Sequence, residues 1–303
     1  TAIPGVYRGK LHIAPNAAAA ADLDLVVRIV PIKLGPTPIT AGLYHFDHTL
    51  WYLYWWRRSF ADTDGWLREQ VFQHERDDFE LLKQYNINSL AFCDDLRVQM
   101  TVNEAGEVTI ADDHRLVQWM DAYSEAGMGP MPWYGFSALG TNYLARGIYG
   151  TKLEQFSPQW EKAYRSLISW VKQKEREHGW PEVVIYLSDE LSNEGATGAE
   201  LGRQLVQLTK DIPGIRTVCS MNGPWEQVML PGLKIAMPNH AFPITTETVD
   251  QIRQAGCELW FYNIGNGRVV WGFYPWRMGA KGRFQWYHRY AVTKPWNTFD
   301  GDS

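Results

Sequence analysis

From residue 40 onward the sequence repeats one pattern: a short apolar segment, a polar loop, an amphipathic segment and a Gly or Pro turn. Short apolar runs between turn residues predict strands, and apolar residues spaced three and four apart predict helices. Strands that alternate with helices form a parallel sheet. The predicted strands cover residues 42–46, 87–93, 128–136, 182–190, 215–221, 233–237, 257–262 and 282–286, and the predicted helices cover residues 69–84, 113–126, 158–178, 197–212 and 246–255.

Eight strands spread over about 250 residues match the usual size of a (β/α)8 barrel. The alternative is a doubly wound sheet, which normally carries a Gly-rich first turn for a nucleotide. The nearest match is Gly265-Asn-Gly267, which lacks the third glycine and opens no clear helix. We therefore predict an α/β fold, a (β/α)8 TIM barrel, over residues 39–303.

Two helix starts carry capping signals. Ser157 followed by Pro158 combines an N-cap with proline at the first helical position, and Gly179 ends the same segment. Thr197 and Glu200 have the spacing of a capping box, which predicts that a helix begins there.

Residues 1–38 differ from the rest because they contain no helical pattern. Two strands are predicted over residues 7–13 and 23–34, separated by an Ala-rich loop. We expect a separate N-terminal β segment over residues 1–38. It is either the edge of a β-sandwich, as a piece of an N-terminal β domain, or a surface ribbon.

The charge balance argues against a nucleic-acid partner, because the net charge is −5 and no basic cluster is present. No apolar run reaches the length of a membrane span, and the first residues lack a signal-peptide pattern. Neither the oligomeric state nor the compartment follows from these observations.

No metal or cofactor is predicted. His45-x-Asp47-His48 resembles the spacing of metal ligands, but the first two side chains share one face of a strand and the last does not. The cysteines lie in apolar, strand-like runs and are read as core residues rather than a disulfide or zinc framework: Cys93, Cys219 and Cys257.

The fourth predicted strand ends in two adjacent carboxylates, Asp189 and Glu190. Chemistry in α/β barrels gathers at the carboxyl ends of the strands, and two acids there can hold different protonation states. Partial burial and the charge of Asp189 are expected to raise the pKa of Glu190. Because neighbouring strand residues face opposite ways, the backbone has to leave β geometry at Ser188 or Asp189. The structural alternative is an N-cap at Asp189 and a solvated Glu190.

Aromatic and polar residues follow the other predicted strands, in a chain with 15 Trp and 15 Tyr. Indole and phenol rings combine an apolar face with a polar tip, which suits a sugar, although about half of these rings are expected in the core. His240 is read as a hydroxyl-binding side chain. The predicted substrate-binding residues are Tyr44, His45, Asp94, Trp133, Tyr134, Asn239, His240, Tyr262, Asn263 and Trp286.

Glycosidases use paired carboxyl groups. No carboxylate follows the seventh predicted strand, and Glu258 lies at the start of that strand. The nucleophile must therefore be Asp94 or Asp95, Asp189 itself, or the substrate. In substrate assistance, a 2-acetamido carbonyl attacks the anomeric carbon while a carboxylate holds the amide N–H.

Two motifs resemble glycoside hydrolase family 123 and related uncharacterised barrels: Leu187-Ser-Asp-Glu-Leu191, and 258–262 with 276–286. The resemblance implies an N-terminal β-sandwich joined to a barrel, a secreted or periplasmic protein, and hydrolysis of the β-N-acetylgalactosaminidase type. It also implies that Glu190 is the general acid/base and that Asp189 orients the acetamido group. Leu191 stands where the family often has proline, which leaves the sugar open.

Two other function classes stay open: a non-catalytic carbohydrate-binding barrel, and a different barrel enzyme, such as a lyase or a two-carboxylate glycosidase using Asp94 or Asp95. The distance between the Glu190 and Asp94 carboxyl groups would separate two of the enzyme classes. About 5 Å suits a direct nucleophile and more than about 6.5 Å suits inversion.

Overall fold

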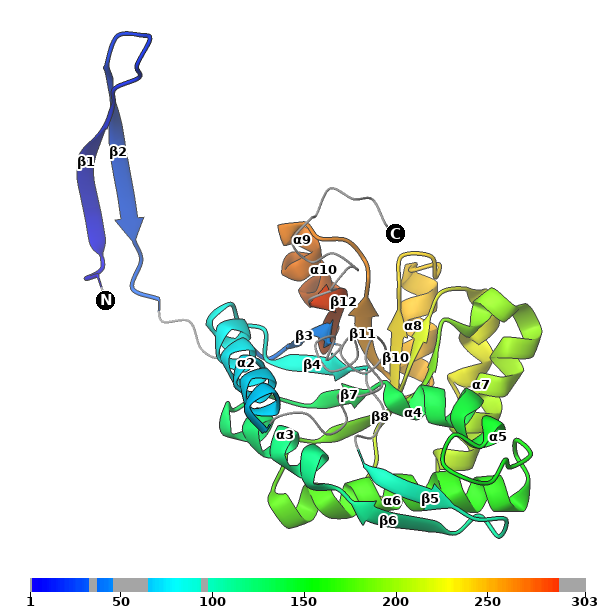
Figure 1. Ribbon diagram of the computed structural model, residues 1–303. Helices are drawn as coiled ribbons and strands as arrows, with labels where there is room; N and C mark the ends of the chain where they lie inside the picture. Colours follow the sequence, from blue (N-terminus) through cyan, green and yellow to red (C-terminus); the bar gives the residue numbers. More distant parts are fainter. Residues whose placement is uncertain (1, 33–36, 46–64, 94–97, 289–303) are drawn as a thin grey trace. The chain divides into compact units, whose positions relative to one another are not determined.

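The computed structural model describes residues 2–32, 37–45, 65–93 and 98–288 (Figure 1). The chain divides into two compact units, residues 1–37 and residues 38–303. Asp94 and Asp95, together with Asp47 and His48, lie outside the described residues.

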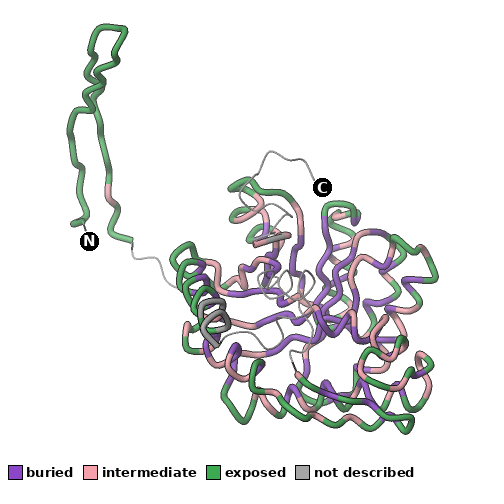
Figure 2. Tube along the Cα trace, viewed as in Figure 1, coloured by how far each residue is buried: buried purple, intermediate pink, exposed green. Residues whose placement is uncertain are grey.

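The N-terminal unit is a two-stranded antiparallel ribbon of β1 (Gly5–Ile13) and β2 (Ala21–Ile29). The second strand is shifted toward the N-terminus relative to the predicted range of 23–34. Nearly every residue of both strands is exposed (Figure 2). A two-stranded ribbon has no second layer to bury an apolar face, so this unit contributes β structure without a core of its own.

The second unit confirms the predicted barrel. Eight parallel strands close in the order β3, β4, β7, β8, β9, β10, β11 and β12. Each one overlaps a segment predicted from the sequence. The strands are β3 (Thr40–His45), β4 (Ser89–Phe92), β7 (Met131–Trp133), β8 (Val183–Asp189), β9 (Thr217–Met221), β10 (Ile235–Pro238), β11 (Glu258–Tyr262) and β12 (Gly282–His288).

The five main helices lie around the strands (Figure 1). They are α2 (Gly65–Gln84), α3 (His114–Glu125), α6 (Pro158–His178), α7 (Gly195–Thr209) and α8 (Thr246–Gln254). None of the helices in the described part of the chain is both long and apolar enough to span a bilayer. The shorter elements are β5 (Gln99–Val102), β6 (Val108–Asp112), α4 (Gly135–Ala138), η2 (Leu139–Tyr143), α5 (Leu144–Arg146), η3 (Leu191–Glu194), η4 (Pro224–Met229), α9 (Arg268–Trp271) and α10 (Phe273–Arg277).

One predicted helix start is confirmed and one is wrong. The Ser157 hydroxyl accepts a hydrogen bond from the backbone N–H of Trp160, and Gly179 ends α6 in the left-handed conformation. The capping box at Thr197 is not formed, because α7 already begins at Gly195. The turn η3 packs directly before it, and the positive φ of Gly195 allows the chain to enter the helix there.

The barrel interior is filled by side chains rather than open. The interior cluster contains Tyr44, Ala91, Val184, Tyr186, Val218, Ile235, Met237, Trp260, Tyr262 and Phe284. Gly42 faces this cluster, and a Cβ atom there would lie 2.2 Å from the ring of Phe284. Likewise, a Cβ atom on Gly282 would lie 2.3 Å from the ring of Trp260. The two glycines therefore make room for the rings of Phe284 and Trp260 inside the barrel.

Candidate active site

A β-bulge in β8 turns the first acid into the barrel. Val184 and Tyr186 face the interior, so strict alternation would place Ser188 there as well. The register against β9 shifts between Tyr186 and Ser188, and Asp189 then pairs with Ser220. The extra residue moves Asp189 to the interior face.

The second acid reaches the same pocket by a change of backbone conformation. Glu190 has φ 51° and ψ 41°, the left-handed region that residues with a side chain rarely adopt. The predicted departure from β geometry is therefore found, but it takes place in the bulge before Ser188 and at Glu190 itself. Such a conformation costs roughly 1–3 kcal/mol and concentrates at functional sites.

Three hydroxyl groups surround the carboxylate of Asp189. Its Oδ1 accepts hydrogen bonds from Tyr186 at 3.1 Å and Ser220 at 2.5 Å, and its Oδ2 accepts one from Tyr134 at 3.1 Å. Tyr44 supports Tyr186 from behind, with 2.5 Å between the two hydroxyl oxygens. A carboxylate offers about four acceptor positions, so one position on Oδ2 remains for a further donor.

The two acids have different surroundings. Burial raises the pKa of Asp189, and the hydrogen bonds from Ser220, Tyr134 and Tyr186 partly offset this rise. Partial burial and then the charge of Asp189 raise the pKa of Glu190, as predicted from the sequence. The Asn239 amide donates to Glu190 Oε1 at 2.6 Å and lowers that pKa, as does the nearby His240. Asp189 is therefore enclosed by donors, whereas Glu190 faces a more open space.

A pocket of about 490 Å³ opens in front of the two acids. No lysine or arginine is among the residues that line it, within the part of the chain that the structure describes. Its walls come from the carboxyl ends of five strands, β8 to β12. The lining residues are Asp189, Glu190, Asn222, Asn239, His240, Ala241, Tyr262, Asn263 and Trp286.

Asn263 joins the walls of this pocket. It has φ 48°, also left-handed, and its Oδ1 accepts a hydrogen bond from the backbone N–H of Trp286 at 2.7 Å. Its backbone oxygen lies 3.0 Å from Nδ1 of His240. Asn263 therefore connects the ends of β10, β11 and β12 around the site.

Five of the ten predicted binding residues line this pocket: Asn239, His240, Tyr262, Asn263 and Trp286. Tyr44 is fully buried beneath it, with its ring centroid 4.8 Å from that of Tyr262 and 5.3 Å from that of Trp286. Tyr44 thus supports the site rather than lining it. Tyr134 hydrogen-bonds Asp189 from the edge of the site. Asp94 lies outside the described residues.

Trp133 and His45 are core residues, which corrects their assignment to the sugar site. Trp133 is fully buried, and its ring packs against Phe92 at a centroid distance of 5.5 Å. Because neighbouring residues face opposite ways, Tyr134 points inward while Trp133 points toward the helices. His45 Nε2 lies 2.8 Å from Glu75 Oε2 on α2, and both side chains are buried.

The sequence reasoning missed Tyr186 and Ser220. Tyr186 lies in β8 and Ser220 in the neighbouring β9, and both strands are largely apolar. Their hydroxyl groups were the available signal. Asn222, which lines the pocket, follows the same strand as Ser220.

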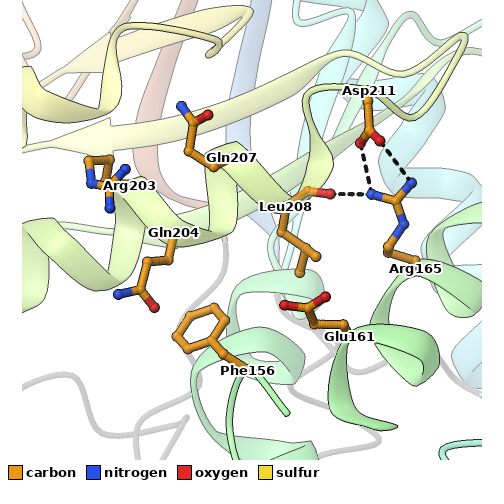
Figure 3. Close-up of a pocket in the computed structure, with 8 residues that line it drawn as sticks. All are labelled: Phe156, Glu161, Arg165, Arg203, Gln204, Gln207, Leu208 and Asp211. Atoms are coloured by element: carbon orange, nitrogen blue, oxygen red, sulfur yellow. Dashed lines mark hydrogen bonds and ion pairs between the residues drawn. The ribbon is translucent and has the colours of Figure 1, made fainter. Parts of the chain in front are cut away.

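A second pocket, of about 380 Å³, lies on α6 and α7 on the outside of the barrel (Figure 3). Three of its four charged side chains, Arg165, Asp211 and Arg203, are in ion pairs. The Arg165 guanidinium bonds the Asp211 carboxylate at 2.8 Å and also the backbone oxygen of Leu208, and Arg203 pairs with Glu200 at 2.6 Å. This pocket therefore offers a ligand few free charges, and the acid pair remains the candidate site.

The sequence matches no family model and no curated protein. The structure is similar to a family 123 glycoside hydrolase from Clostridium perfringens, with a TM-score of 0.65 at 13% identity over 94% of this chain. This chain spans 56% of the length of that enzyme. It is also similar to an endo-1,4-beta-mannanase from Rhizomucor miehei, with a TM-score of 0.51 at 11% identity over 84% of this chain and 88% of the mannanase. At such identities the likeness establishes the fold alone, a TIM barrel.

Proposed function

We propose that this protein is a glycoside hydrolase that cleaves 2-acetamido sugars by a substrate-assisted, retaining mechanism. The observation that carries the proposal is the surroundings of Asp189. Three hydroxyl donors fix its carboxylate and leave one acceptor position, beside a Glu190 that is hydrogen-bonded and partly open. An amide N–H of the substrate is the kind of donor that this position suits.

In the first step, Asp189 accepts a hydrogen bond from the acetamido N–H and orients the carbonyl oxygen toward the anomeric carbon. That oxygen forms a bond to the anomeric carbon as the glycosidic C–O bond breaks, and Glu190 gives its proton to the leaving oxygen. In the second step, water attacks the anomeric carbon and Glu190 accepts a proton from the water. The cyclic intermediate opens, and the sugar keeps its configuration.

The pocket chemistry supports a neutral sugar. Trp286 and Tyr262 offer ring faces for C–H groups, and Asn222, Asn239 and His240 offer hydrogen bonds for hydroxyls. The absence of lysine and arginine from the lining, among the residues that are described, disfavours a carboxylated or phosphorylated sugar at this position. The likeness to the Clostridium perfringens enzyme, whose structure concerns glycolipid glycan hydrolysis, supports a carbohydrate substrate.

The test uses pairs of chromogenic glycosides that differ only in a 2-acetamido or a 2-hydroxyl group. We expect cleavage of the 2-acetamido member of at least one pair. Asp189→Asn is expected to lose that activity whatever the leaving group, because the acetamido group is no longer held. Glu190→Gln is expected to lose about 10²–10⁴-fold in rate, most severely with poor leaving groups.

Two outcomes would contradict the proposal. Cleavage of only the 2-hydroxyl members would favour a two-carboxylate glycosidase with Asp94 or Asp95 as the nucleophile. Binding of sugars without cleavage of any glycoside would favour a carbohydrate-binding barrel.

A further inference from the structure

We propose that Ser220 is a positioning residue that fixes both acids at once, through a single hydroxyl group that donates to Asp189 and accepts from Glu190. The catalytic roles that it serves rest on the proposed function. The hydrogen bonds of the Ser220 hydroxyl do not depend on that function.

The geometry assigns both roles to one oxygen. Ser220 is fully buried on β9, and its Oγ lies 2.5 Å from Asp189 Oδ1 and 3.1 Å from the backbone nitrogen of Glu190. The backbone N–H of Glu190 can only donate, so the hydroxyl accepts there. Its single proton is then free for the carboxylate.

Both contacts occur where the backbone departs from regular geometry. The bulge in β8 brings Asp189 opposite Ser220, and Glu190 then enters the left-handed region. Among the described residues, the Glu190 N–H has one further acceptor, the backbone oxygen of Ser220 at 3.3 Å. The hydrogen bond to the Ser220 hydroxyl is therefore the shorter of the two that hold Glu190 in its left-handed conformation.

Removing the hydroxyl has two separate consequences. Asp189 loses a donor that favours its ionised form, so its pKa is expected to rise further. The backbone of Glu190 keeps only the longer bond, so its carboxyl group is expected to be less well aligned with the leaving oxygen. The first effect acts on every substrate, and the second acts mainly on substrates with poor leaving groups.

Other titratable groups face these acids and belong to the same environment. Burial raises the pKa of each neighbouring tyrosine above its usual value, so these phenols stay neutral while a carboxyl group titrates. The groups that interact electrostatically with Asp189, Glu190 or these tyrosines are Tyr44, Cys93, Tyr134, Tyr186, His240 and Tyr262.

The test compares Ser220→Ala with Ser89→Ala. Ser89 is a matched control because it is also fully buried in a barrel strand, and its hydroxyl donates to the backbone oxygen of Pro130 at 2.5 Å, away from the acids. We expect Ser220→Ala to lower kcat/KM about 10- to 100-fold, the value of one hydrogen bond to a charged group. The loss is expected to be greater with poor leaving groups, and Ser89→Ala is expected to retain the wild-type values.

The acid limb of the pH profile gives a second readout. Asp189 must be ionised to hold the amide, so a higher pKa moves this limb to higher pH in Ser220→Ala. Ser220→Thr, which keeps the hydroxyl, is expected to restore the limb. An unmoved limb in Ser220→Ala, or an equal shift in Ser89→Ala, would overturn the proposal.

Titration of the carboxyl group of Asp189 separates this inference from the proposed function. The substrate-free protein is labelled with ¹³C at the Asp carboxyl groups, and Asp189→Asn identifies the signal. A higher titration midpoint in Ser220→Ala supports the coupling whichever glycoside is cleaved. An unchanged midpoint refutes it, even if 2-acetamido sugars are hydrolysed.

Discussion

Replacing Asn239 with Asp would change the proton affinity of Glu190 while leaving the local backbone in place. Asn239 Nδ2 donates to Glu190 Oε1 at 2.6 Å, and its Oδ1 accepts from the backbone N–H groups of Ala241 at 2.8 Å and Phe242 at 3.3 Å. Asp has the same shape and keeps the acceptor. Only the donor to Glu190 is lost, and a negative charge takes its place.

The magnitude follows from that single contact. A hydrogen bond to a charged group contributes about 1.5–3 kcal/mol, and one pKa unit corresponds to about 1.36 kcal/mol, so its loss alone raises the pKa by about one to two units. The new negative charge acts in the same direction. Because Glu190 is only half-buried, solvent screens both effects, and we expect a rise of about one unit.

The assay is the pH dependence of kcat/KM. Glu190 donates a proton to the leaving group, so activity is lost as the pH rises through its pKa. A higher pKa therefore moves the basic limb to higher pH in Asn239→Asp. Asn103→Asp is the matched control on the β5–β6 hairpin, because the Asn103 side chain donates to Glu107 at 2.9 Å and accepts from two backbone N–H groups.

A basic limb that stays in place in Asn239→Asp, or that moves equally in Asn103→Asp, would refute the assignment of Glu190 as the general acid. A shift to lower pH would contradict the electrostatic reasoning as well.

Three further outcomes are expected. Trp286→Ala is expected to weaken the binding of a sugar ligand by a few kcal/mol at most, as measured by calorimetry; unchanged affinity would mean that Trp286 does not contact the sugar. Burial raises the pKa of Glu226, so the native state binds its proton more tightly than the unfolded chain and wild-type stability falls as pH rises from about 4.5 through the raised pKa. Glu226→Gln is expected to show a smaller decline between pH 4 and pH 7 in urea unfolding, because the raised pKa values of Asp189 and Glu190 leave part of it in place; an identical decline in the variant would contradict the prediction. Gly42→Ala is expected to destabilise the barrel by about 1–3 kcal/mol through overpacking against Phe284, and an unchanged unfolding free energy would show that the ring can move aside.

The barrel itself could be predicted because its signal is local and repeated. Each strand is a short apolar run between turn residues. Eight such strands, alternating with helices, indicate both the number of strands in the sheet and their parallel arrangement. The acid pair was also visible, since Asp189 and Glu190 interrupt an apolar strand abruptly. Thr197 was misread because the turn η3 packs before α7, a contact that the helix sequence does not carry.

The sequence could not predict which strand residues point into the barrel and which point toward the helices. In a barrel both faces of a strand are apolar, so the sequence did not separate Trp133, which packs toward the helices, from Tyr134, which approaches Asp189. The bulge that turns Asp189 inward depends on pairing with β9. His45 is polar, yet a carboxylate from α2, thirty residues away, satisfies it in the core.

A series of substrates with increasingly fluorinated acetamido groups tests the central claim most directly. Fluorine withdraws electrons from the carbonyl oxygen and makes it a poorer nucleophile, without changing the leaving group. If the substrate supplies the nucleophile, kcat/KM is expected to fall steeply from N-acetyl through N-fluoroacetyl and N-difluoroacetyl to N-trifluoroacetyl glycosides. A flat series with an active enzyme would mean that the acetamido oxygen is not the nucleophile, and it would contradict the role proposed for Asp189.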